Sequence, residues 1–584
     1  MKLLTKMLWG GALFLGGAMV ALATLTLYYW QRVSVNTVFM HITTLNDVPL
    51  RLMAIFAVCT STIAILFVIF GLKLCKKWRL FLCLCAICFF AYTFKLDTYI
   101  RGIGEKSYIY ENEYVSWTDD EKSSPKRNLI VLYLESMEDD YRHDKNGDNL
   151  LPELSKLYDK NYHFDDFVQL EHTFATILSQ VAGLCGVIYK NDFSNNDISS
   201  VSNNTLANAI CVPDVLAKKG YNTFFIKGAS LNFTMTGKIM AQHSFKELLG
   251  WHELKNIPGI KKGNGWGISD NSLYEIIKQK LSQLAKQDKP FLAAITTLDT
   301  HFPDTFFDNK CTREFNDERD AVKCADKMAA DFIKWVQKQD FYQNTTIVIV
   351  GDHINNSVSH SGDEIFNVII NPVEGLQKQP HKWTTLDLAP TMLEAIGINA
   401  PKFGLGRSLW QKEPTLIEKY GDKLDWEFYK SSEFYRKFNV CKKTTKNYNN
   451  LQLNKKIQKK DIELLATNKI SVENLIGFYE TNDTIYADEL NFSIETKKDV
   501  CINMKFLAAI AKNQEDHILV NNKEVAVWSL TKDEEPPFKR TICLKRKDIP
   551  EDGKIVLKID RKMQCNIFTC GYGWQEIEVV EQQN

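Results

Sequence analysis

The sequence predicts an α/β protein with transmembrane helices at its amino terminus and a small β-rich domain at its carboxyl terminus. Three observations support this: apolar segments fill the first hundred residues, strand and helix patterns alternate from 127 to about 409, and short alternating segments follow residue 470. Alternation of strands and helices is typical of α/β folds with a mostly parallel sheet. The 584 residues suffice for a large catalytic domain with accessory parts.

The apolar segments predict a membrane anchor of three helices over residues 1–97. Residues 8–30 and 52–72 are uncharged and long enough to cross a bilayer, whereas 80–94 is at the lower margin of length. A cleaved signal peptide is the alternative for the first segment, but two further apolar segments and its own length argue against that interpretation. The polar stretch 98–126 is predicted to be a juxtamembrane linker.

Basic residues predict the orientation of this anchor. The short loop between the second and third segments carries Lys73, Lys76, Lys77 and Arg79, and Lys2 and Lys6 lie at the amino terminus. By the positive-inside rule these parts face the cytoplasm. Three crossings then place everything after about residue 95 outside the cytoplasm.

Further along the chain, the pattern predicts a catalytic domain over 127–412, a linking helical segment over 413–470 and a β-sandwich accessory domain over 471–584. The expected strands of the catalytic domain are 128–134, 221–226, 290–298 and 345–350. The expected helices are 151–157, 212–219, 271–287, 319–338 and 387–396.

The cysteines fit an exported domain. Five lie in or beside the membrane segments, and nine lie in the exported part, where an oxidising compartment permits disulfides. Candidate pairs are Cys185 with Cys211, Cys311 with Cys324, and Cys565 with Cys570, although sequence alone does not determine connectivity. Zinc ligation is the weaker alternative, because no CxxC pairs recur.

Two buried-type strands end at groups that bind cations. The strand 128–134 is followed by Glu135, and the strand 345–350 is followed, after a glycine, by Asp352 and His353. Parallel α/β sheets carry their chemistry just beyond the carboxyl ends of such strands. We therefore expect one divalent-metal site and an enzyme.

A nucleophile is expected in the segment 171–186. Thr176 and Ser179 lie near the start of a predicted helix, where the helix dipole favours a phosphate group. The alternative for either hydroxyl is a simple helix N-cap.

Five motifs in order resemble a known family. Together they resemble the membrane-anchored phosphoglycerol transferases that modify periplasmic glucans and, more distantly, the lipoteichoic acid synthases. Both groups belong to the alkaline phosphatase and sulfatase superfamily. The resemblance covers most of 127–409 and implies an α/β/α catalytic domain in the periplasm, anchored in the bacterial inner membrane by several spans. The motifs occupy 128–136, 220–250, 296–303, 351–353 and 384–397.

The resemblance assigns roles to individual residues. It implies that Glu135, Thr176, Asp352 and His353 hold one divalent metal, that Thr176 is the nucleophile, and that His301 protonates the leaving oxygen or orients the acceptor. Three oxygens and one imidazole suit manganese or magnesium best, and zinc is also compatible.

The chain also departs from the family. Ala175 stands where the synthases have a basic residue, and their tryptophan and arginine that hold glycerol phosphate have no clear match in 228–238. Lys227 or Lys238 is expected to supply that charge, although a solvated lysine is an equal alternative. Asp270 and Asp387 match family motifs and are interpreted as supporting or structural residues.

The implied reaction transfers phosphoglycerol from phosphatidylglycerol to a glycan hydroxyl through a phosphoglyceryl-threonine, with release of diacylglycerol. A phosphoethanolamine transferase is the nearest alternative, and a non-catalytic, membrane-tethered glycan-binding protein is the second. A formylglycine sulfatase would need a Cys/Ser-x-Pro-x-Arg motif, which is missing around Thr176. Equal numbers of basic and acidic residues, 71 each, give no reason to expect a nucleic-acid partner.

Overall fold

The computed structural model divides the chain into two compact units, Met1–Asn191 with Ala209–Arg436, and Asp192–Asn208 with Lys437–Asn584. It describes residues 2–30, 48, 50–118, 127–144, 146–190, 206–355, 362–439, 449–451, 456–458, 466–467, 485–487, 489–494, 498–508, 515–521, 523–529, 538–551, 554–561 and 572–581.

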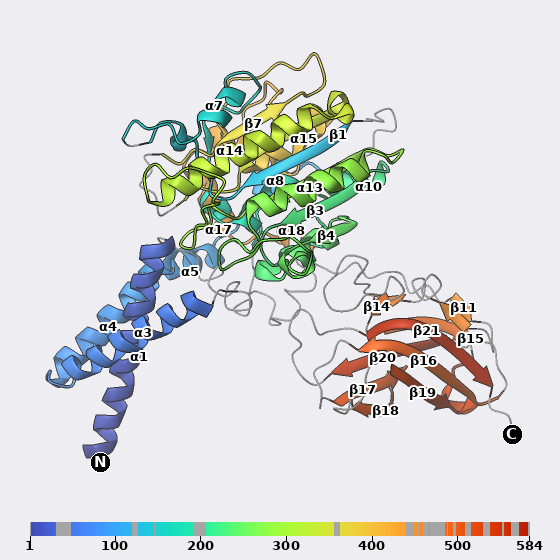
Figure 1. Cartoon of the computed structure of the whole chain (residues 1–584). Coiled ribbons are helices and arrows are strands. Elements are labelled where there is room, and N and C mark those ends of the chain that lie inside the picture. Colours follow the sequence, from blue (N-terminus) through green and yellow to red (C-terminus); the bar gives the residue numbers. More distant parts are fainter. Residues whose placement is uncertain are drawn as a thin grey trace. The chain divides into compact units, whose positions relative to one another are not determined.

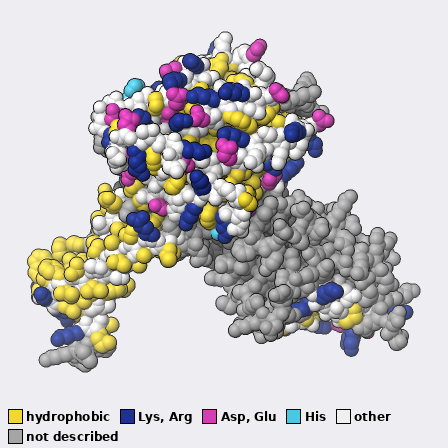
Figure 2. All heavy atoms as spheres, viewed as in Figure 1, with side chains coloured by type: hydrophobic (Ala, Val, Ile, Leu, Met, Phe, Trp, Pro, Cys, Tyr) yellow, Lys and Arg dark blue, Asp and Glu magenta, His cyan; other side chains and the backbone are white. Residues whose placement is uncertain are grey.

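The first unit begins with three membrane-type helices, α1 (Lys2–Trp30), α3 (Leu50–Gly71) and α4 (Lys76–Thr93), and α1 packs against the other two. A Cβ on Gly17 of α1 would lie 2.7 Å from the Ala64 Cα, so glycine permits the close approach of α3. Hydrophobic side chains gather over these helices (Figure 2). Thr5–Tyr28 and Leu50–Gly71 are long and apolar enough to span a membrane, and α4 makes a third span only together with the bent segment that follows it.

The segment predicted as a linker is largely helical. Residues 96–113 form α5 (Leu96–Gly104) and α6 (Ile109–Glu113), and 119–126 lie outside the described residues. The Gly102 backbone lies so close to the Tyr429 carbonyl that a larger residue would overlap it. Tyr110 is fully buried, with its ring 5.3 Å from that of Tyr435. The sequence analysis expected a linker over 98–126 and no helices within it.

A six-stranded sheet forms the centre of the catalytic part, in the order β4-β3-β5-β1-β6-β7 (Figure 1). All neighbours pair in parallel except β7, which runs antiparallel to β6. The strands are β1 (Asn128–Leu134), β3 (Asn222–Lys227), β4 (Glu247–Leu249), β5 (Phe291–Thr296), β6 (Thr345–Gly351) and β7 (Asn367–Ile370). The β-branched and aliphatic run of β1 is buried along its whole length, as a central strand requires.

Helices cover both faces of this sheet. Ile130, Leu132 and Leu134 of β1 share a core with the apolar faces of α13 and α14, while Tyr133 faces α8 near Gly183. The helices are α7 (Pro152–Tyr158), α8 (Thr176–Cys185), α10 (Val212–Lys218), α11 (Thr236–Gln242), α12 (Trp251–Leu254), α13 (Asp270–Leu284), α14 (Glu318–Gln337) and α15 (Leu388–Ala395). The structure confirms the predicted α/β class and its mostly parallel sheet.

Smaller elements complete the first unit and extend it to residue 436. Two short pairs join β2 (Phe167–Val168) with β8 (Trp383–Thr384), and β9 (Lys402–Phe403) with β10 (Gly406–Arg407). The helices α16 (Leu416–Tyr420), α17 (Lys423–Tyr429) and α18 (Glu433–Arg436) follow. The helical part of the predicted segment 413–470 therefore belongs to the first unit, whereas strands begin at residue 449.

The second unit is β-rich, as predicted, and holds two mostly antiparallel sheets. One has the order β11-β15-β20-β17-β18, with β13 beside β15, and the other β12-β21-β16-β19, with β14 beside β21. The strands are β11 (Asn449–Leu451), β12 (Lys456–Gln458), β13 (Ala466–Thr467), β14 (Ile485–Ala487), β15 (Glu489–Ile494), β16 (Val500–Ala508), β17 (Glu515–Val520), β18 (Lys523–Ser529), β19 (Phe538–Leu544), β20 (Lys554–Arg561) and β21 (Tyr572–Glu581).

Three disulfides lie in the described part of the chain. Cys185–Cys211 joins the end of α8 to the start of α10, and Cys311–Cys324 fastens a loop to α14. The third, Cys501–Cys543, links neighbouring residues of β16 and β19 and was not among the predicted pairs. Cys565 and Cys570 lie outside the described residues.

Replacing both Cys185 and Cys211 by alanine should lower the free energy of unfolding by about 2–4 kcal/mol, because the unfolded chain loses a cross-link. The two cysteines are 26 positions apart. The measurement is the urea midpoint of the purified full chain in detergent. Cys85→Ala, which changes a free cysteine exposed on α4, is the control and should leave the midpoint unchanged. Equal losses in both variants would contradict a stabilising role for the disulfide.

Candidate active site

The first side chain of the candidate site stands at the carboxyl end of β1. Glu135 follows Leu134, and its backbone N–H donates to Thr297 Oγ1 at 2.9 Å while its carbonyl accepts from the Thr300 hydroxyl. The next residue, Ser136, has φ 51°, a left-handed conformation that is unfavourable for a residue other than glycine. These contacts hold the Glu135 carboxylate at the edge of the sheet, with the side chain only 3% exposed.

Asp352 and His353 reach the same edge from β6. Leu134 and Gly351 are partners in the β1–β6 register, so the residues that follow them are neighbours. Asp352 Oδ1 accepts the Ser136 N–H at 2.7 Å and the His353 N–H at 2.8 Å. The structure therefore brings the residues that follow the two strands together at one edge of the sheet, as the sequence analysis expected.

The imidazole of His353 is oriented by its own backbone neighbour. Nδ1 pairs with the Ile354 carbonyl at 2.9 Å, so this nitrogen carries the proton. Nε2 then faces the carboxylates, 3.3 Å from Glu135 Oε1 and 3.6 Å from Asp352 Oδ2. A backbone carbonyl behind the ring is the usual arrangement for a metal-binding histidine.

Thr176 is the first residue of α8, and its hydroxyl donates to Glu135 Oε2 at 3.3 Å. Ala175, in extended conformation, occupies the N-cap position and its side chain has no oxygen to offer. The N-cap alternative therefore does not apply to Thr176. Ser179 lies one turn further in, buried, and its hydroxyl has no hydrogen-bond partner among the described residues. Of the two predicted hydroxyls, Thr176 is the one bonded to the cluster.

The cluster fits a divalent cation. Glu135, Asp352 and His353 each offer one ligand atom, and these atoms all lie within 4.8 Å of one another. Asp352 Oδ2 is buried and has no hydrogen-bond partner in the described chain, so it can ligate without breaking a bond. Carboxylate and hydroxyl oxygens with one imidazole match manganese, magnesium or zinc. Three of the four predicted ligands form this cluster, and the hydroxyl of the fourth, Thr176, lies 3.3 Å from Glu135 Oε2.

The electrostatics of the cluster point the same way. Burial raises the pKa of Glu135, but the nearby charges of His301 and His353 outweigh burial and hold it at about 2. Burial and then the charge of Glu135 raise the pKa of Asp352 to about 7. Burial lowers the pKa of His353, yet Asp352 and Glu135 raise it to about 10. A buried pair of carboxylates thus requires positive charge beside it, from a proton or a cation.

His301 lies beyond the end of β5, on the loop that contacts Glu135 through Thr297 and Thr300. Its ring lies 4.7 Å from that of Trp266, measured between centroids. Asp270 fixes the base of this loop, because its carboxylate accepts the Leu298 N–H at 2.7 Å and the Asp299 N–H at 3.2 Å. The supporting role expected of Asp270 agrees with these bonds.

Asp387 supports a different part of the fold. Its carboxylate accepts the Arg407 N–H at 2.7 Å and the Thr384 N–H at 2.9 Å, which joins β8 to β10 near the start of α15. This contact is structural.

The two predicted substrate-binding lysines are both buried, Lys227 at 4% and Lys238 at 8% exposure. Lys227 ends β3 opposite Thr296 in the register, at the same sheet edge as Glu135, and its Nζ lies 3.4 Å from Thr236 Oγ1. Lys238 is on α11, two residues after Thr236, and burial lowers its pKa to about 7. The burial rules out the alternative of solvated lysines.

Sequence reasoning missed the residues that hold the ligands in place. Thr297 and Thr300 bond the Glu135 backbone, and Gln169 Oε1 accepts the Ile354 N–H at 2.8 Å. Glu138, whose Oε1 accepts the Asn355 N–H at 3.2 Å, braces the same loop. Only the position of Thr297 and Thr300 at the carboxyl end of the predicted strand 290–298 could have indicated them.

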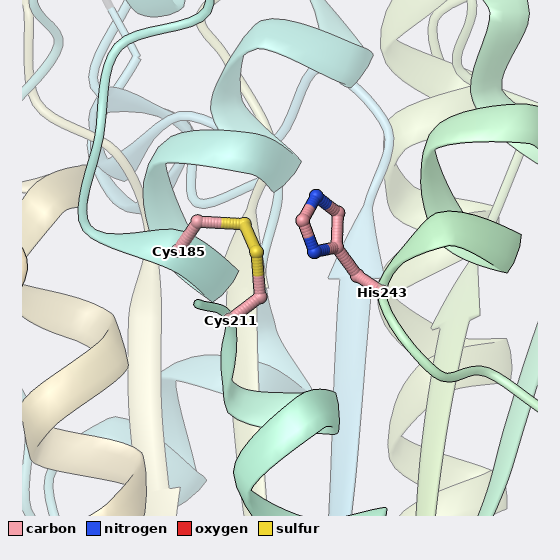
Figure 3. A group of neighbouring side chains, drawn as sticks. All are labelled: Cys185, Cys211 and His243. Atoms are coloured by element: carbon pink, nitrogen blue, oxygen red, sulfur yellow. A yellow bond between two sulfur atoms is a disulfide. The ribbon is translucent and has the colours of Figure 1, made fainter. Parts of the chain in front are cut away.

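A second cluster has metal-ligand residue types but a different chemistry. Cys185, Cys211 and His243 lie together and are all buried. Figure 3 shows that the two sulfurs are bonded to each other, with the imidazole facing them. The Nδ1 of His243 pairs with Asp214 Oδ2 at 2.9 Å. A disulfide offers no thiolate, so this group is a structural cross-link.

With this geometry in hand, comparison with known proteins identifies the domain that carries the site. A family model described as Sulfatase matches residues 127–398. These residues form a sulfatase-family domain. The match contains Glu135, Thr176, Asp352 and His353, and it confirms the superfamily resemblance of the motifs.

Relatives of the sulfatase-family domain include the phosphoglycerol transferase I of Citrobacter koseri, 31% identical over 302 residues. That alignment covers 49% of this chain and 39% of the relative. A solved alkaline phosphatase superfamily protein from Vibrio parahaemolyticus is 20% identical with TM-score 0.41, covering 52% of this chain and 72% of that protein. The lipoteichoic acid synthase LtaP from Listeria monocytogenes is 17% identical with TM-score 0.40, with coverages of 51% and 78%.

Asp352→Asn should weaken manganese binding by at least about 100-fold, because it replaces a buried anionic ligand by a neutral amide. Isothermal titration of the purified full chain with Mn²⁺ measures the change. Glu374→Gln alters an exposed carboxylate outside the cluster and serves as the control. If both variants bound manganese like the unmodified chain, the cluster would not be its site.

Proposed function

We propose that the protein transfers phosphoglycerol from phosphatidylglycerol to a hydroxyl of a periplasmic or cell-surface glycan. The observation that carries this proposal is the Thr176 hydroxyl, 3.3 Å from Glu135 Oε2 inside a buried cation-binding cluster. A hydroxyl in that position at a helix amino terminus has both a cation site and a helix dipole to stabilise a phosphoryl group. The name of the Citrobacter koseri relative agrees with this activity.

Thr176 acts as nucleophile in the first half of the reaction. Glu135, Asp352 and His353 would hold a divalent ion, which would lower the pKa of the Thr176 hydroxyl and offset the charge of phosphoryl oxygens. The Thr176 hydroxyl gives its proton to solvent and its Oγ1 forms a bond to phosphorus. The bond from phosphorus to the diacylglycerol oxygen breaks, and His301 gives that oxygen a proton. The product is a phosphodiester between Thr176 and glycerol.

The second half reverses these roles. His301, now neutral, takes the proton of an acceptor hydroxyl as that oxygen attacks phosphorus. The bond to Thr176 Oγ1 breaks, and this oxygen takes a proton from solvent to restore the hydroxyl, while His301 keeps the proton of the acceptor for the next cycle. One residue thus serves as acid and then as base, and the kinetics are ping-pong.

Lys227 and Lys238 are proposed to bind the phosphoglycerol head group. Both are buried; Lys227 lies at the sheet edge that carries the cluster, with Thr236 Oγ1 3.4 Å from its Nζ, and Lys238 is on α11. The phosphodiester of the donor is an anion, which these lysines would attract. Their charges would take the place of the family arginine that this chain lacks.

The membrane helices support a lipid donor. Because phosphatidylglycerol stays in the bilayer, an anchored enzyme meets it at high effective concentration. We propose that the chain is a multi-pass protein of the bacterial inner membrane and that the catalytic domain acts on its outer side. The glycan acceptor is unidentified, and the described β sheets of the second unit indicate no ligand.

Thr176→Ala should abolish transfer, and the unmodified chain should gain a phosphoglyceryl group on Thr176. Intact-protein and peptide mass spectrometry after incubation with phosphatidylglycerol and manganese would detect the adduct. Ser179→Ala, which removes the other buried hydroxyl of the same helix, is the matched control and should retain the adduct.

The same experiment distinguishes the alternatives. If an adduct on Thr176 formed with phosphatidylethanolamine and not with phosphatidylglycerol, the protein would be a phosphoethanolamine transferase. A fully active enzyme that never carries an adduct on Thr176 would overturn the covalent mechanism. If neither lipid released diacylglycerol, the alternative of a non-catalytic glycan-binding protein would be favoured.

The affinity for donor should depend on pH through Lys238. Burial lowers the pKa of this lysine to about 7, so the ammonium form, which attracts phosphate, is lost as pH rises through that value. The KM for phosphatidylglycerol should rise about tenfold between pH 6 and pH 8.5, the equivalent of one charge-assisted hydrogen bond. Lys238→Arg should keep KM low across the range, whereas Lys238→Met should give a high, pH-independent KM. A pH profile identical in all three proteins would contradict this role.

A further inference from the structure

The loop that leads to Thr176 rests on the membrane helices. Phe174 packs against a small cluster made by Ala23 of α1 and Phe94 at the end of α4. It precedes the proposed nucleophile by two residues. An aromatic residue two positions before the proposed nucleophile is therefore in contact with the membrane-type helices.

Polar contacts fasten the same loop. Lys95, directly after Phe94, forms an ion pair with Glu171, and the Tyr429 hydroxyl donates to the same carboxylate. Asp425 of α17 accepts the Glu171 N–H at 3.2 Å and pairs with His172 Nδ1 at 3.1 Å. The loop is held from two sides, by the anchor and by α17.

The other side of the site touches the remaining membrane helix. Trp266 and Leu298 form a cluster against which Val48 and Leu52, at the start of α3, are packed. The ring of Trp266 lies 4.7 Å from that of His301, between centroids. Trp266 is only 7% exposed, and its buried indole Nε1 has no hydrogen-bond partner among the described residues.

These contacts all involve one end of the helix bundle. They use the carboxyl-terminal part of α1, the beginning of α3 and the end of α4, whereas the basic loop 73–79 follows α3 at the opposite end. By the positive-inside rule that loop is cytoplasmic, so the contacting ends lie at the outer face of the membrane. Thr176 and His301 each have an aromatic neighbour that reaches this face.

We propose that Phe174 and Trp266 hold the diacylglycerol part of the lipid donor while its phosphate lies at the Glu135 cluster. Phe174 packs against the first acyl methylenes, and the Trp266 indole N–H donates to an ester oxygen of the lipid. Tryptophan suits this position because it joins an apolar ring to one donor and is enriched at membrane interfaces. The inference rests on the proposed function, since it takes a phospholipid as the donor.

A comparison of two donors tests the proposal. One is phosphatidylglycerol in mixed vesicles, and the other is a water-soluble nitrophenyl ester of glycerol phosphate, which has the same head group without acyl chains. Phe174→Ala and Trp266→Phe should each lower the ratio of kcat/KM for the lipid to kcat/KM for the soluble donor by about tenfold, the equivalent of one lost contact or hydrogen bond. Trp78→Phe, at the cytoplasmic start of α4, is the matched control and should leave the ratio unchanged. A merely structural role would lower both values together and overturn the proposal.

Photo-crosslinking separates this inference from the proposed function. A phosphatidylglycerol analogue with a diazirine near the ester end of its acyl chain is bound to the full-length Thr176→Ala variant in nanodiscs, where no turnover occurs. Adducts are expected on the peptides that contain Phe174 and Trp266. Adducts elsewhere, in an enzyme that transfers phosphoglycerol normally, overturn the inference alone. Adducts at these peptides without transfer by the unmodified chain sustain the lipid site and overturn the proposed reaction.

Discussion

The structure depends on the repulsion between two buried carboxylates, Glu135 and Asp352. They are neighbours because β1 and β6 are parallel and in register, and both strands are apolar enough to stay buried to their ends. Two anions in such a place are costly unless positive charge is supplied. The backbone donors of Ser136 and His353 supply part of it, and the imidazole of His353 supplies more. A divalent cation bound between the carboxylates would offset their repulsion, and in the proposed reaction it would also attract the phosphate of the donor.

The surroundings follow from the need to keep that pair in place. Thr297 and Thr300 fix the Glu135 backbone, and Asp270 in turn fixes the loop that carries them. None of these residues faces a substrate in the proposed reaction. Their hydrogen bonds make the loop rigid, so that the distances between the Thr176 hydroxyl and the ligands stay the same when charge develops on a transferred phosphoryl group.

Much of this could be predicted from the sequence, and the limits have physical causes. The continuous apolar runs before Glu135 and Asp352 indicated parallel strands, and parallel strands bring their carboxyl ends together whatever the intervening chain does. The start of a helix near Thr176 could also be predicted, because the residues that indicate it are neighbours in the sequence. The roles of Thr297 and Thr300 could not be found in this way, because they arise only when β5 is placed beside β1 in the sheet. The helical nature of residues 96–113 was hidden for a similar reason: α5 and α6 are stabilised by contacts with α17 and α18, more than 300 residues away.

The burial of Tyr110 has a practical consequence for anyone who shortens this chain. Its ring lies among Phe428, Phe434 and Tyr435, so a soluble fragment that begins at residue 127 lacks Tyr110 and leaves these three aromatic side chains without the ring that packs on them. Such a fragment would be prone to aggregate for reasons unrelated to the missing bilayer. A fragment beginning ahead of α5 would retain the covering helices. The useful boundary for a fragment without the membrane-type helices therefore lies after α4, well before the first strand of the sheet.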